Sequence, residues 1–374
     1  MPTTPGPGTR SRVAVIPGDD AAPEAVHATL EVLRAMDLPI QWEVLPDGET
    51  LARELSRPER DRMLRETIDA CDAALFGATS GKTGGVWYLR WGKDTYANVR
   101  PVKWRVGVPS PLREPSGIDY VIVRENLEDF YVGIEGDLAE LRSSGLDLRP
   151  FGGALDVSPR NGPATASEGR FAVKVLTKEN TERAAHFACH LALERKSRGH
   201  PGRVTCSCKH NVLWRTDGFF RQTVAAVVAE YPQLSYEEFI VDDFARRLVA
   251  APHDLDVVLL PNLYGDILSD EAAATVGGLG VAPSGCYGED FAYFEPVHGT
   301  APDIAGRNVV NPTATILSAV MLLEHLGLAG AASQLERAVD GALAEGDQLT
   351  PDLGGTGTTR SFAQAVSSRV GREP

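Results

Sequence analysis

The block PNLYGDILSDEAA at residues 261–273 places two carboxylates, Asp266 and Asp270, four residues apart. If the block forms a helix, both side chains lie on the same face. Two carboxylates that converge on one point suit a hard divalent cation such as Mg²⁺ or Mn²⁺. Taken alone, this spacing is more typical of two solvated acids at a helix start. Asp242, which follows the strand-like run FIV, is by itself typical of a loop or capping acid.

A second stretch, FGATSGKTGG at residues 76–85, ends like the phosphate-binding loop of a nucleotide hydrolase. That motif requires a glycine five residues before Gly81, and this chain has Phe76 there, which argues against an ATP-binding loop. The loop still offers backbone N–H groups, Lys82 and Thr83, a lining that suits an anion. The alternative is a mobile glycine-rich loop whose polar groups face water.

The elements that must position these residues alternate between strand and helix. Apolar runs rich in β-branched residues predict strands at 12–16, 73–78, 119–126, 171–177, 203–209 and 256–262. Helical spacing of apolar residues predicts helices after Pro23 and over 178–196, 217–230 and 312–326. This alternation predicts an α/β protein. No G-x-G-x-x-G follows the first strand, so we expect no ordinary Rossmann dinucleotide site.

The bulk composition narrows the class of partner. The 374-residue chain has a formal net charge of −14, which argues against nucleic acid and anionic membranes as partners. No apolar run is long enough to span a bilayer, and the first ten residues lack the apolar core of a secretory signal. The five cysteines are odd in number and form no C-x-x-C, which fits a reducing compartment. We therefore expect a cytoplasmic protein that acts on a small molecule.

Five motifs in one order connect these features: YANVRPVK (96–103), VRENLEDFYVGIEG (123–136), NLYGDILSDEAA (262–273), FEPVHGTAPDIAG (294–306) and NPTATILSA (311–319). With them the chain closely resembles the β-decarboxylating dehydrogenases, the family of isocitrate, isopropylmalate, homoisocitrate and tartrate dehydrogenases. The resemblance extends from Arg12 to TPDLGGTGTT at 350–359, nearly the whole chain. It implies oxidation of a 2-hydroxy acid that bears a 3-carboxylate, with NAD(P)⁺ and a divalent metal, followed by loss of CO₂.

The resemblance also implies roles for individual residues. The positions that match the family's metal ligands are Asp242, Asp266 and Asp270. The positions that match its carboxylate-binding arginines are Arg90, Arg100 and Arg124. Tyr131 matches the tyrosine that protonates the enolate carbon. Lys209 matches the lysine that helps deprotonate the hydroxyl, and Asn211 fits a polar position beside it.

In this family the lysine and one metal aspartate reach into the site of a second subunit. The resemblance therefore implies that Lys209 and Asp242, which is also placed among the catalytic residues, serve the neighbouring subunit. We expect a homodimer with shared active sites as the smallest working unit.

The resemblance implies a cofactor site without G-x-G-x-x-G. The residues assigned to it are His298, Gly299, Thr300, Ala301, Pro302, Asp303, Ile304 and Asn311. A carboxylate at Asp303 can accept hydrogen bonds from the ribose hydroxyls and would repel the 2′-phosphate of NADP. NADP-using relatives carry Lys and Tyr where this chain has Asp303 and Ile304. We therefore expect NAD as the cofactor.

The substrate is harder to assign, because relatives recognise the C3 substituent with residues just before Arg90. Isocitrate enzymes carry Ser and Asn where this chain has Gly84 and Val86, and isopropylmalate enzymes carry Glu and a Leu pair where it has Thr83, Val86 and Trp87. Neither pattern is kept, whereas YANVRPVK most resembles the homoisocitrate enzymes.

Lys82 and Thr83, with the loop's amides, lead us to expect a substrate with an anionic C3 substituent, as in isocitrate or homoisocitrate. A phosphonate such as 3-(phosphonomethyl)malate, in secondary metabolism, is the first alternative. An isopropylmalate or tartrate dehydrogenase and a non-catalytic regulatory subunit are the others.

The implied fold has two domains. A large cofactor-binding domain would comprise residues 1–108 and 252–374, with 1–11 as a flexible tail. A small domain, 109–251, would carry the dimer contacts and an intertwined excursion around 135–170. One loop departs from the family: GDGIGPE is replaced by GDDAAPE at 18–24, so a backbone position that needs positive φ would be strained or rebuilt.

Overall fold

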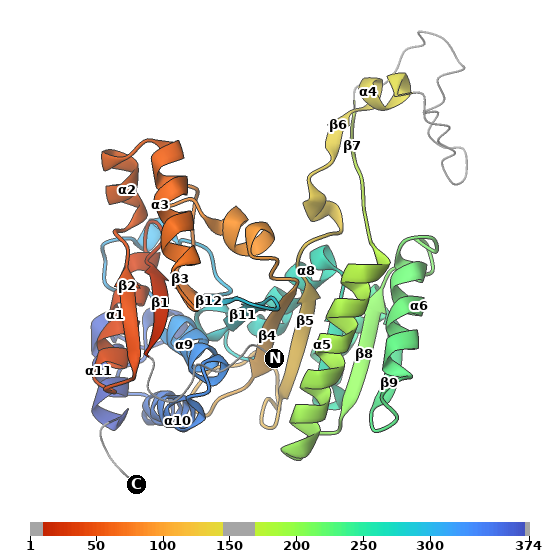
Figure 1. Ribbon diagram of the computed structural model, residues 1–374. Helices are drawn as coiled ribbons and strands as arrows, with labels where there is room; N and C mark the ends of the chain where they lie inside the picture. The colour runs from red at the N-terminus through yellow and green to blue at the C-terminus, as the bar shows by residue number, and fades with distance from the viewer. Residues whose placement is uncertain (1–9, 145–168, 371–374) are drawn as a thin grey trace.

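A ten-stranded mixed sheet forms the frame of the protein (Figure 1), whose computed structural model describes residues 10–144 and 169–370. The strand order is β2-β1-β3-β12-β11-β4-β5-β10-β8-β9. The strands are β1 (Ser11–Ile16), β2 (Ile40–Val44), β3 (Ala73–Phe76), β4 (Ala97–Lys103), β5 (Asp119–Glu125), β8 (Arg203–Cys208), β9 (Ser235–Ile240), β10 (Val257–Leu260), β11 (Pro283–Tyr287) and β12 (Ala292–Pro296). β11 pairs antiparallel with β12 and β4, and β4 with β5, whereas the remaining pairs in this sheet are parallel.

Helices cover both faces of the sheet, which confirms the predicted α/β class. They are α1 (Ala22–Arg34), α2 (Gly48–Glu54), α3 (Arg57–Asp69), α4 (Leu138–Ser143), α5 (Lys178–Ser197), α6 (Asp217–Val228), α7 (Val241–Ala250), α8 (Asn262–Thr275), α9 (Thr313–His325), α10 (Ala329–Glu345) and α11 (Thr359–Val370). A π-helical turn, η1 (Tyr88–Gly92), and two 3₁₀ turns, η2 (Phe130–Val132) and η7 (Pro302–Ile304), carry residues of interest.

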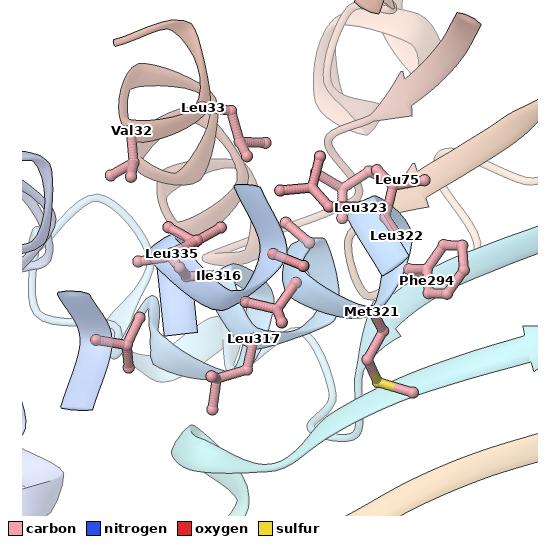
Figure 2. Close-up of a cluster of buried hydrophobic side chains, with 14 of the residues drawn as sticks. Val32, Leu33, Leu75, Phe294, Ile316, Leu317, Met321, Leu322, Leu323 and Leu335 are labelled. Atoms are coloured by element: carbon pink, nitrogen blue, oxygen red, sulfur yellow. The ribbon is translucent and has the colours of Figure 1, made fainter. Parts of the chain in front are cut away.

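Alternating strand residues divide the core between the two faces, as the pleat requires. On β5, Val123 packs in the cluster with α5, whereas Tyr120 and Ile122 pack in the cluster with α7 and α8. At the other end of the sheet, a larger cluster joins β3 and β12 to α1, α9 and α10 (Figure 2). Leu75 and Phe294 lie in this cluster, against the apolar helix α9.

The predicted helices and strands recur except in one region, and the strands after β1 are shorter than predicted. The run 171–177 was predicted as one strand, but β7 covers only Arg170–Ala172 and pairs with β6 (Glu135–Asp137). β6, β7 and α4 lie apart from the main sheet (Figure 1). The strand β7 ends at Ala172, and the residues after it lead back to the main sheet without forming a strand. The rest of the predicted excursion, 145–168, and residues 1–9 of the predicted tail lie outside the described residues.

The division into two domains stays a prediction. The sheet is continuous across its boundaries, since β4 pairs with β5, and β10, which follows residue 252, pairs with β5 and β8. None of the described helices is both long enough and apolar enough to cross a membrane.

A buried ion pair joins α5 to the start of β10 in the main sheet. Arg195 Nε donates to Asp256 Oδ1 at 2.7 Å, and Asp256 Oδ2 accepts the N–H groups of Gly202 and Arg203 at 2.8 and 3.0 Å. Asp256 has no exposed surface. Removing the Asp256 charge would leave Arg195 only the half-buried Asp119, 3.1 Å from its Nη1, as an acidic partner.

We therefore predict that Asp256→Asn lowers the free energy of unfolding by about 3 kcal/mol, measured by urea denaturation. Asp243→Asn is the control, because Asp243 pairs with Arg246 and Arg247 at the surface and should matter little. Equal losses in the two variants would contradict this account of the α5 anchor.

Candidate active site

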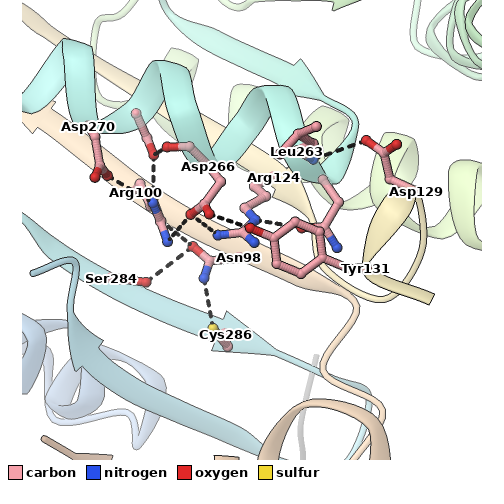
Figure 3. A network of polar contacts seen from close by, with 12 residues as sticks. Asn98, Arg100, Arg124, Asp129, Tyr131, Leu263, Asp266, Asp270, Ser284 and Cys286 are labelled. Carbon is pink, nitrogen blue, oxygen red and sulfur yellow. Dashed lines mark hydrogen bonds and ion pairs between the residues drawn. The ribbon is translucent and has the colours of Figure 1, made fainter. Parts of the chain in front are cut away.

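The site is built where α8 crosses the paired strands β4 and β5 (Figure 3). Arg100 of β4 and Arg124 of β5 are both buried, and Arg124 is only 1% exposed. Gly265 of α8 lies directly on Arg124: a Cβ at residue 265 would lie 2.7 Å from Arg124 Cβ. Glycine at position 265 therefore lets α8 approach β5 closely enough for Asp266 and Asp270 to contact the arginines.

Asp266 is the centre of the polar network in Figure 3. It accepts hydrogen bonds from Arg124 and from the Tyr131 hydroxyl at 2.5 Å, and it pairs with Arg100 at 3.2 Å. Burial alone would raise the pKa of Asp266, but the charges of Arg124 and Arg100 outweigh it and hold the pKa below its ordinary value. Asp266, whose side chain is 35% exposed, is therefore a carboxylate at neutral pH.

Asp270 follows one turn later on the same face of α8, as the sequence predicted. Its carboxylate lies 3.4 Å from Arg100, which also donates to Ser269 at 2.6 Å. Burial raises the pKa of Asp270. Two carboxylates one turn apart form a pair of hard oxygen donors, which is the chemistry that Mg²⁺ or Mn²⁺ requires.

Two arginines of this cluster have a buried nitrogen that makes no hydrogen bond to any described residue. These atoms are Arg124 Nη2 and Arg90 Nε. Arg90 comes from η1, and its guanidinium lies over the rings of Tyr131, at 5.7 Å, and Trp91, at 5.3 Å. Because buried N–H groups are almost always paired, unpaired guanidinium nitrogens beside Tyr131 indicate a place for an anionic ligand.

Lys209 and Asp242 form a second, separate group. Lys209 Nζ donates a hydrogen bond to the Asp242 carboxylate, whose side chain is 67% exposed, and this hydrogen bond lowers the pKa of Asp242. Both line a cavity with Tyr264 and Ile267 of α8. Asn211 lies exposed in the turn that follows Lys209.

The three predicted metal ligands thus fall into two groups: Asp266 and Asp270 face the arginines, whereas Asp242 pairs with Lys209. Within residues 10–144 and 169–370 of one chain, no three His, Cys, Asp or Glu side chains come together to hold a metal. Among the described residues, no third carboxylate joins Asp266 and Asp270.

The glycine-rich loop of residues 79–83 does surround an anion, but the anion is Asp19. The Asp19 carboxylate accepts the N–H groups of Ser80, Lys82 and Thr83 at 2.7, 3.0 and 2.9 Å. The hydroxyls of Thr79 and Thr83 also donate to it, at 2.7 and 2.5 Å. An acid of this chain thus occupies these amides, and the anionic substituent on the substrate stays a prediction.

Lys82 likewise faces acids of its own chain. Its Nζ lies 2.7 Å from Asp20 and 2.9 Å from Glu49. Asp20 adopts φ +55°, so the loop keeps a left-handed position although its glycine is missing. Aspartate tolerates this conformation better than most residues, and here its side chain is also fixed by Lys82.

The predicted cofactor residues lie on the loop around η7, which contacts the GDDAAPE loop. Ala21 N–H donates to Thr300 O at 3.0 Å, and the Glu24 carboxylate accepts the N–H groups of Gly306 and Asn308 at 2.6 and 2.7 Å. His298 Nε2 is buried and has no hydrogen-bond partner within residues 10–144 and 169–370, and burial lowers the pKa of His298.

Most of the other residues assigned to the cofactor remain accessible. Gly299, Ala301, Pro302 and Asp303 are exposed and Ile304 is half-buried, while buried Asn311 donates to Asp352 at 2.9 Å. An exposed loop beside an unpartnered histidine nitrogen fits a polar cofactor.

Sequence reasoning missed three residues that hold the cluster. Asn262 accepts from Arg124 Nε at 2.8 Å, and Ser269 accepts from Arg100. Both lie in the motif that supplied Asp266, at positions where helical spacing brings them to the same strands. Asp129, which accepts the N–H of Leu263 in the first turn of α8, lies outside that helix, so helical spacing could not indicate it.

The chain is similar to known proteins over nearly its whole length. The model of the isocitrate/isopropylmalate dehydrogenase family matches residues 12–366. The chain is 42% identical over 364 residues to the 3-isopropylmalate/3-methylmalate dehydrogenase of Methanocaldococcus jannaschii, covering 97% of this chain and 99% of that protein. It is 41% identical to the isocitrate/homoisocitrate dehydrogenase of Thermus thermophilus, covering 95% and 97%. The crystal structure of isocitrate dehydrogenase from Methylococcus capsulatus superposes with a TM-score of 0.79 at 31% identity, covering 97% and 100%.

The Asp19 contacts predict a pH-dependent stability. Burial alone would raise the pKa of Asp19, but the hydrogen bonds from Thr83, Thr79, Ser80 and Lys82 hold it below the ordinary value. A depressed pKa in the folded state means that the stabilisation is present above the unfolded value, about 3.9, and is lost as the pH falls through the folded value.

We predict that Asp19→Asn lowers the free energy of unfolding at pH 7 by about 2 kcal/mol and that this difference shrinks below pH 4. Urea denaturation of both proteins from pH 7 to pH 3 measures it. Asp47→Asn is the control, since Asp47 accepts one amide, that of Thr50, as a helix cap. A difference that stays constant with pH would contradict the account.

Proposed function

Because the chain belongs to the isocitrate/isopropylmalate dehydrogenase family, whose members are β-decarboxylating hydroxy acid dehydrogenases, we propose that it oxidatively decarboxylates a 3-substituted malate with NAD⁺ and Mg²⁺ or Mn²⁺. One observation carries the proposal for this chain. Arg100 and Arg124 pair with Asp266, Arg90 lies over Tyr131, and Arg90 and Arg124 each have a buried nitrogen without a partner among the described residues. That arrangement suits a dicarboxylate held against a carboxylate pair.

In this mechanism the arginines hold the two malate carboxylates by charge-assisted hydrogen bonds. Lys209 takes the proton of the substrate hydroxyl, and Tyr131 delivers a proton to C3 after CO₂ leaves. Burial raises the pKa of Tyr131, which keeps its hydroxyl protonated and ready to donate. A divalent cation at Asp266 and Asp270 would polarise the substrate oxygen, and NAD⁺ on the loop of residues 298–304 would accept the hydride.

An exposed apolar surface supports the proposed homodimer. Next to Lys209, the turn after β8 exposes Val212 and Trp214, the latter to 66%, and Ile267 is exposed between Asp266 and Asp270 on α8. Large apolar side chains gathered around a site indicate a protein interface. A second copy on this face would bring its Lys209 and Asp242 toward the arginine cluster, completing the ligand set that one chain leaves open.

The substrate proposal retains two candidates for the C3 substituent. An anionic group, as in isocitrate, homoisocitrate or 3-(phosphonomethyl)malate, rests on Lys82, although Asp20 and Glu49 already balance its charge. An alkyl group, as in 3-isopropylmalate, is favoured by Trp87, which lies three residues before Arg90, is exposed, and stacks on Trp91 at 4.4 Å. These candidates differ in the need for a positive charge in the pocket.

Initial rates of NAD⁺ reduction with isocitrate, homoisocitrate, 3-isopropylmalate, tartrate and 3-(phosphonomethyl)malate test the function. We expect turnover of at least one compound with Mn²⁺ and its loss on adding EDTA. Lys82→Ala should raise KM if the preferred substrate is anionic and leave it unchanged if the substituent is alkyl; Lys178→Ala, an exposed lysine of α5, is the control. No turnover of any of the five would contradict the proposal and favour a non-catalytic subunit.

We also predict a higher kcat/KM with NAD⁺ than with NADP⁺, by about tenfold or more, because the exposed Asp303 carboxylate would repel a 2′-phosphate. Asp303→Lys should narrow the difference, whereas Asp290→Lys, an exposed acid in the turn between β11 and β12, should not. Steady-state kinetics with both cofactors would refute the NAD assignment if NADP⁺ were preferred.

A further inference from the structure

A buried charged triad lies between the two groups of the candidate site. It consists of Asp129, Lys174 and Asp217, and the side chains of both acids have no exposed surface, while that of Lys174 is 6% exposed. Lys174 Nζ lies 2.6 Å from Asp217 and 3.4 Å from Asp129, over the ring of Tyr264 at 4.4 Å. Buried charges are costly even when paired, so a buried triad calls for a role beyond stability.

Each acid of the triad holds a different part of the site. Asp129 Oδ2 accepts the N–H of Leu263 at 3.0 Å (Figure 3), in the first turn of the helix that carries Asp266. Asp129 also lies two residues before Tyr131 and accepts the N–H of Phe130 at 2.9 Å. Asp217 Oδ2 accepts the backbone N–H of Lys209 at 2.7 Å. The triad thus spans from the Tyr131 turn and α8 to the turn that presents Lys209.

The backbone of Asp129 gives independent support. Asp129 has φ +67° and ψ −139°, a region that non-glycine residues rarely occupy and that costs of order 1–3 kcal/mol. Glycine at position 129 would relieve the strain but would lack the carboxylate. The strain persists because four contacts fix this residue: Phe130, Leu263, Lys174 and a backbone pair with Val175.

We infer that Asp129, Lys174 and Asp217 are positioning residues that hold the Tyr131 turn, the start of α8 and the Lys209 turn in one fixed arrangement. None of the three is assigned to substrate, cofactor or metal. They act through the backbone of the residues that do the chemistry, and their value for catalysis rests on the proposed function. A shift of about 1 Å in one of these groups is enough to lower kcat about 100-fold.

Hydrogen exchange tests the physical connection without any assumption about activity. In Asp129→Asn, we expect the Lys209 amide to exchange about tenfold faster, although Lys209 is bonded to Asp217 and not to Asp129. Asp256→Asn is the matched control: Asp256 is equally buried but anchors the opposite end of β8, so it should not change exchange at Lys209. Faster exchange confined to residues 129–131 and 263 would overturn the inference.

A double-mutant cycle tests whether Lys174 is shared. Asp129→Asn and Asp217→Asn each leave Lys174 one acid, whereas the double variant leaves it none, so the loss of stability should exceed the sum of the single losses. Additive losses of stability would contradict the inference that Asp129 and Asp217 share Lys174. This cycle needs only denaturant unfolding and holds even if the chain proves inactive.

Kinetics then separate positioning from mere stability. With whichever of isocitrate, homoisocitrate and 3-isopropylmalate the wild type oxidises, Asp217→Ala should lower kcat about 100-fold with little change in KM. Asp217→Asn should restore much of it, because the amide oxygen can still accept the Lys209 N–H. An unchanged kcat in Asp217→Ala would overturn the positioning role. If the wild type oxidises none of the three, the proposed function is in doubt, while exchange and the cycle still decide on the triad.

Discussion

The contact between Asp266 and Arg124 is the interaction on which the rest of the site depends. A fully buried guanidinium is stable only when its charge is balanced, and here one carboxylate from α8 balances it at a point where the helix touches the strand through Gly265. The antiparallel pairing of β4 and β5 brings Arg100 beside Arg124, so the same carboxylate serves both. Tyr131 then binds the other oxygen of Asp266, which fixes the site's acid next to its charges.

This arrangement explains why a single chain looks incomplete. Nitrogens of Arg90 and Arg124 have no hydrogen-bond partner among the described residues. Meanwhile Lys209 and Asp242 pair with each other at an exposed, apolar surface. The arginine cluster has hydrogen-bond donors without partners among the described residues, and the second group has an accessible lysine and carboxylate. The two groups are complementary, as expected if a dicarboxylate, a cation and a second chain complete the site.

Much of the site could be predicted from the sequence because its chemistry is concentrated in short motifs. Helical spacing correctly placed Asp266 and Asp270 on one face, and the strand-like run 119–126 correctly placed Arg124 on a strand, whereas the strand that carries Arg100 was not predicted. The loop of residues 79–83 shows the limit of this approach. Its amides do gather around an anion, but Asp19 lies some sixty residues earlier in the chain, and no local pattern indicates that it fills the loop before a substrate can.

Asp129 and Lys174 could not be predicted for a related reason. Asp129 has a positive φ, and Lys174 is buried between two acids. Both features result from the way the β6–β7 excursion rejoins the sheet, and residue spacing along the chain does not indicate that path.

The central claim is that one active site uses the arginine cluster of one chain and Lys209 of another, and mixing two inactive variants tests it most directly. Tyr131→Phe and Lys209→Met would be purified separately, denatured together and refolded, and NAD⁺ reduction measured with the substrate that the wild type prefers. Shared sites predict recovery of about one quarter of wild-type activity, since about half of the dimers are mixed and each of these has one intact site. A mixture as inactive as either variant alone would show that Tyr131 and Lys209 act within the same chain.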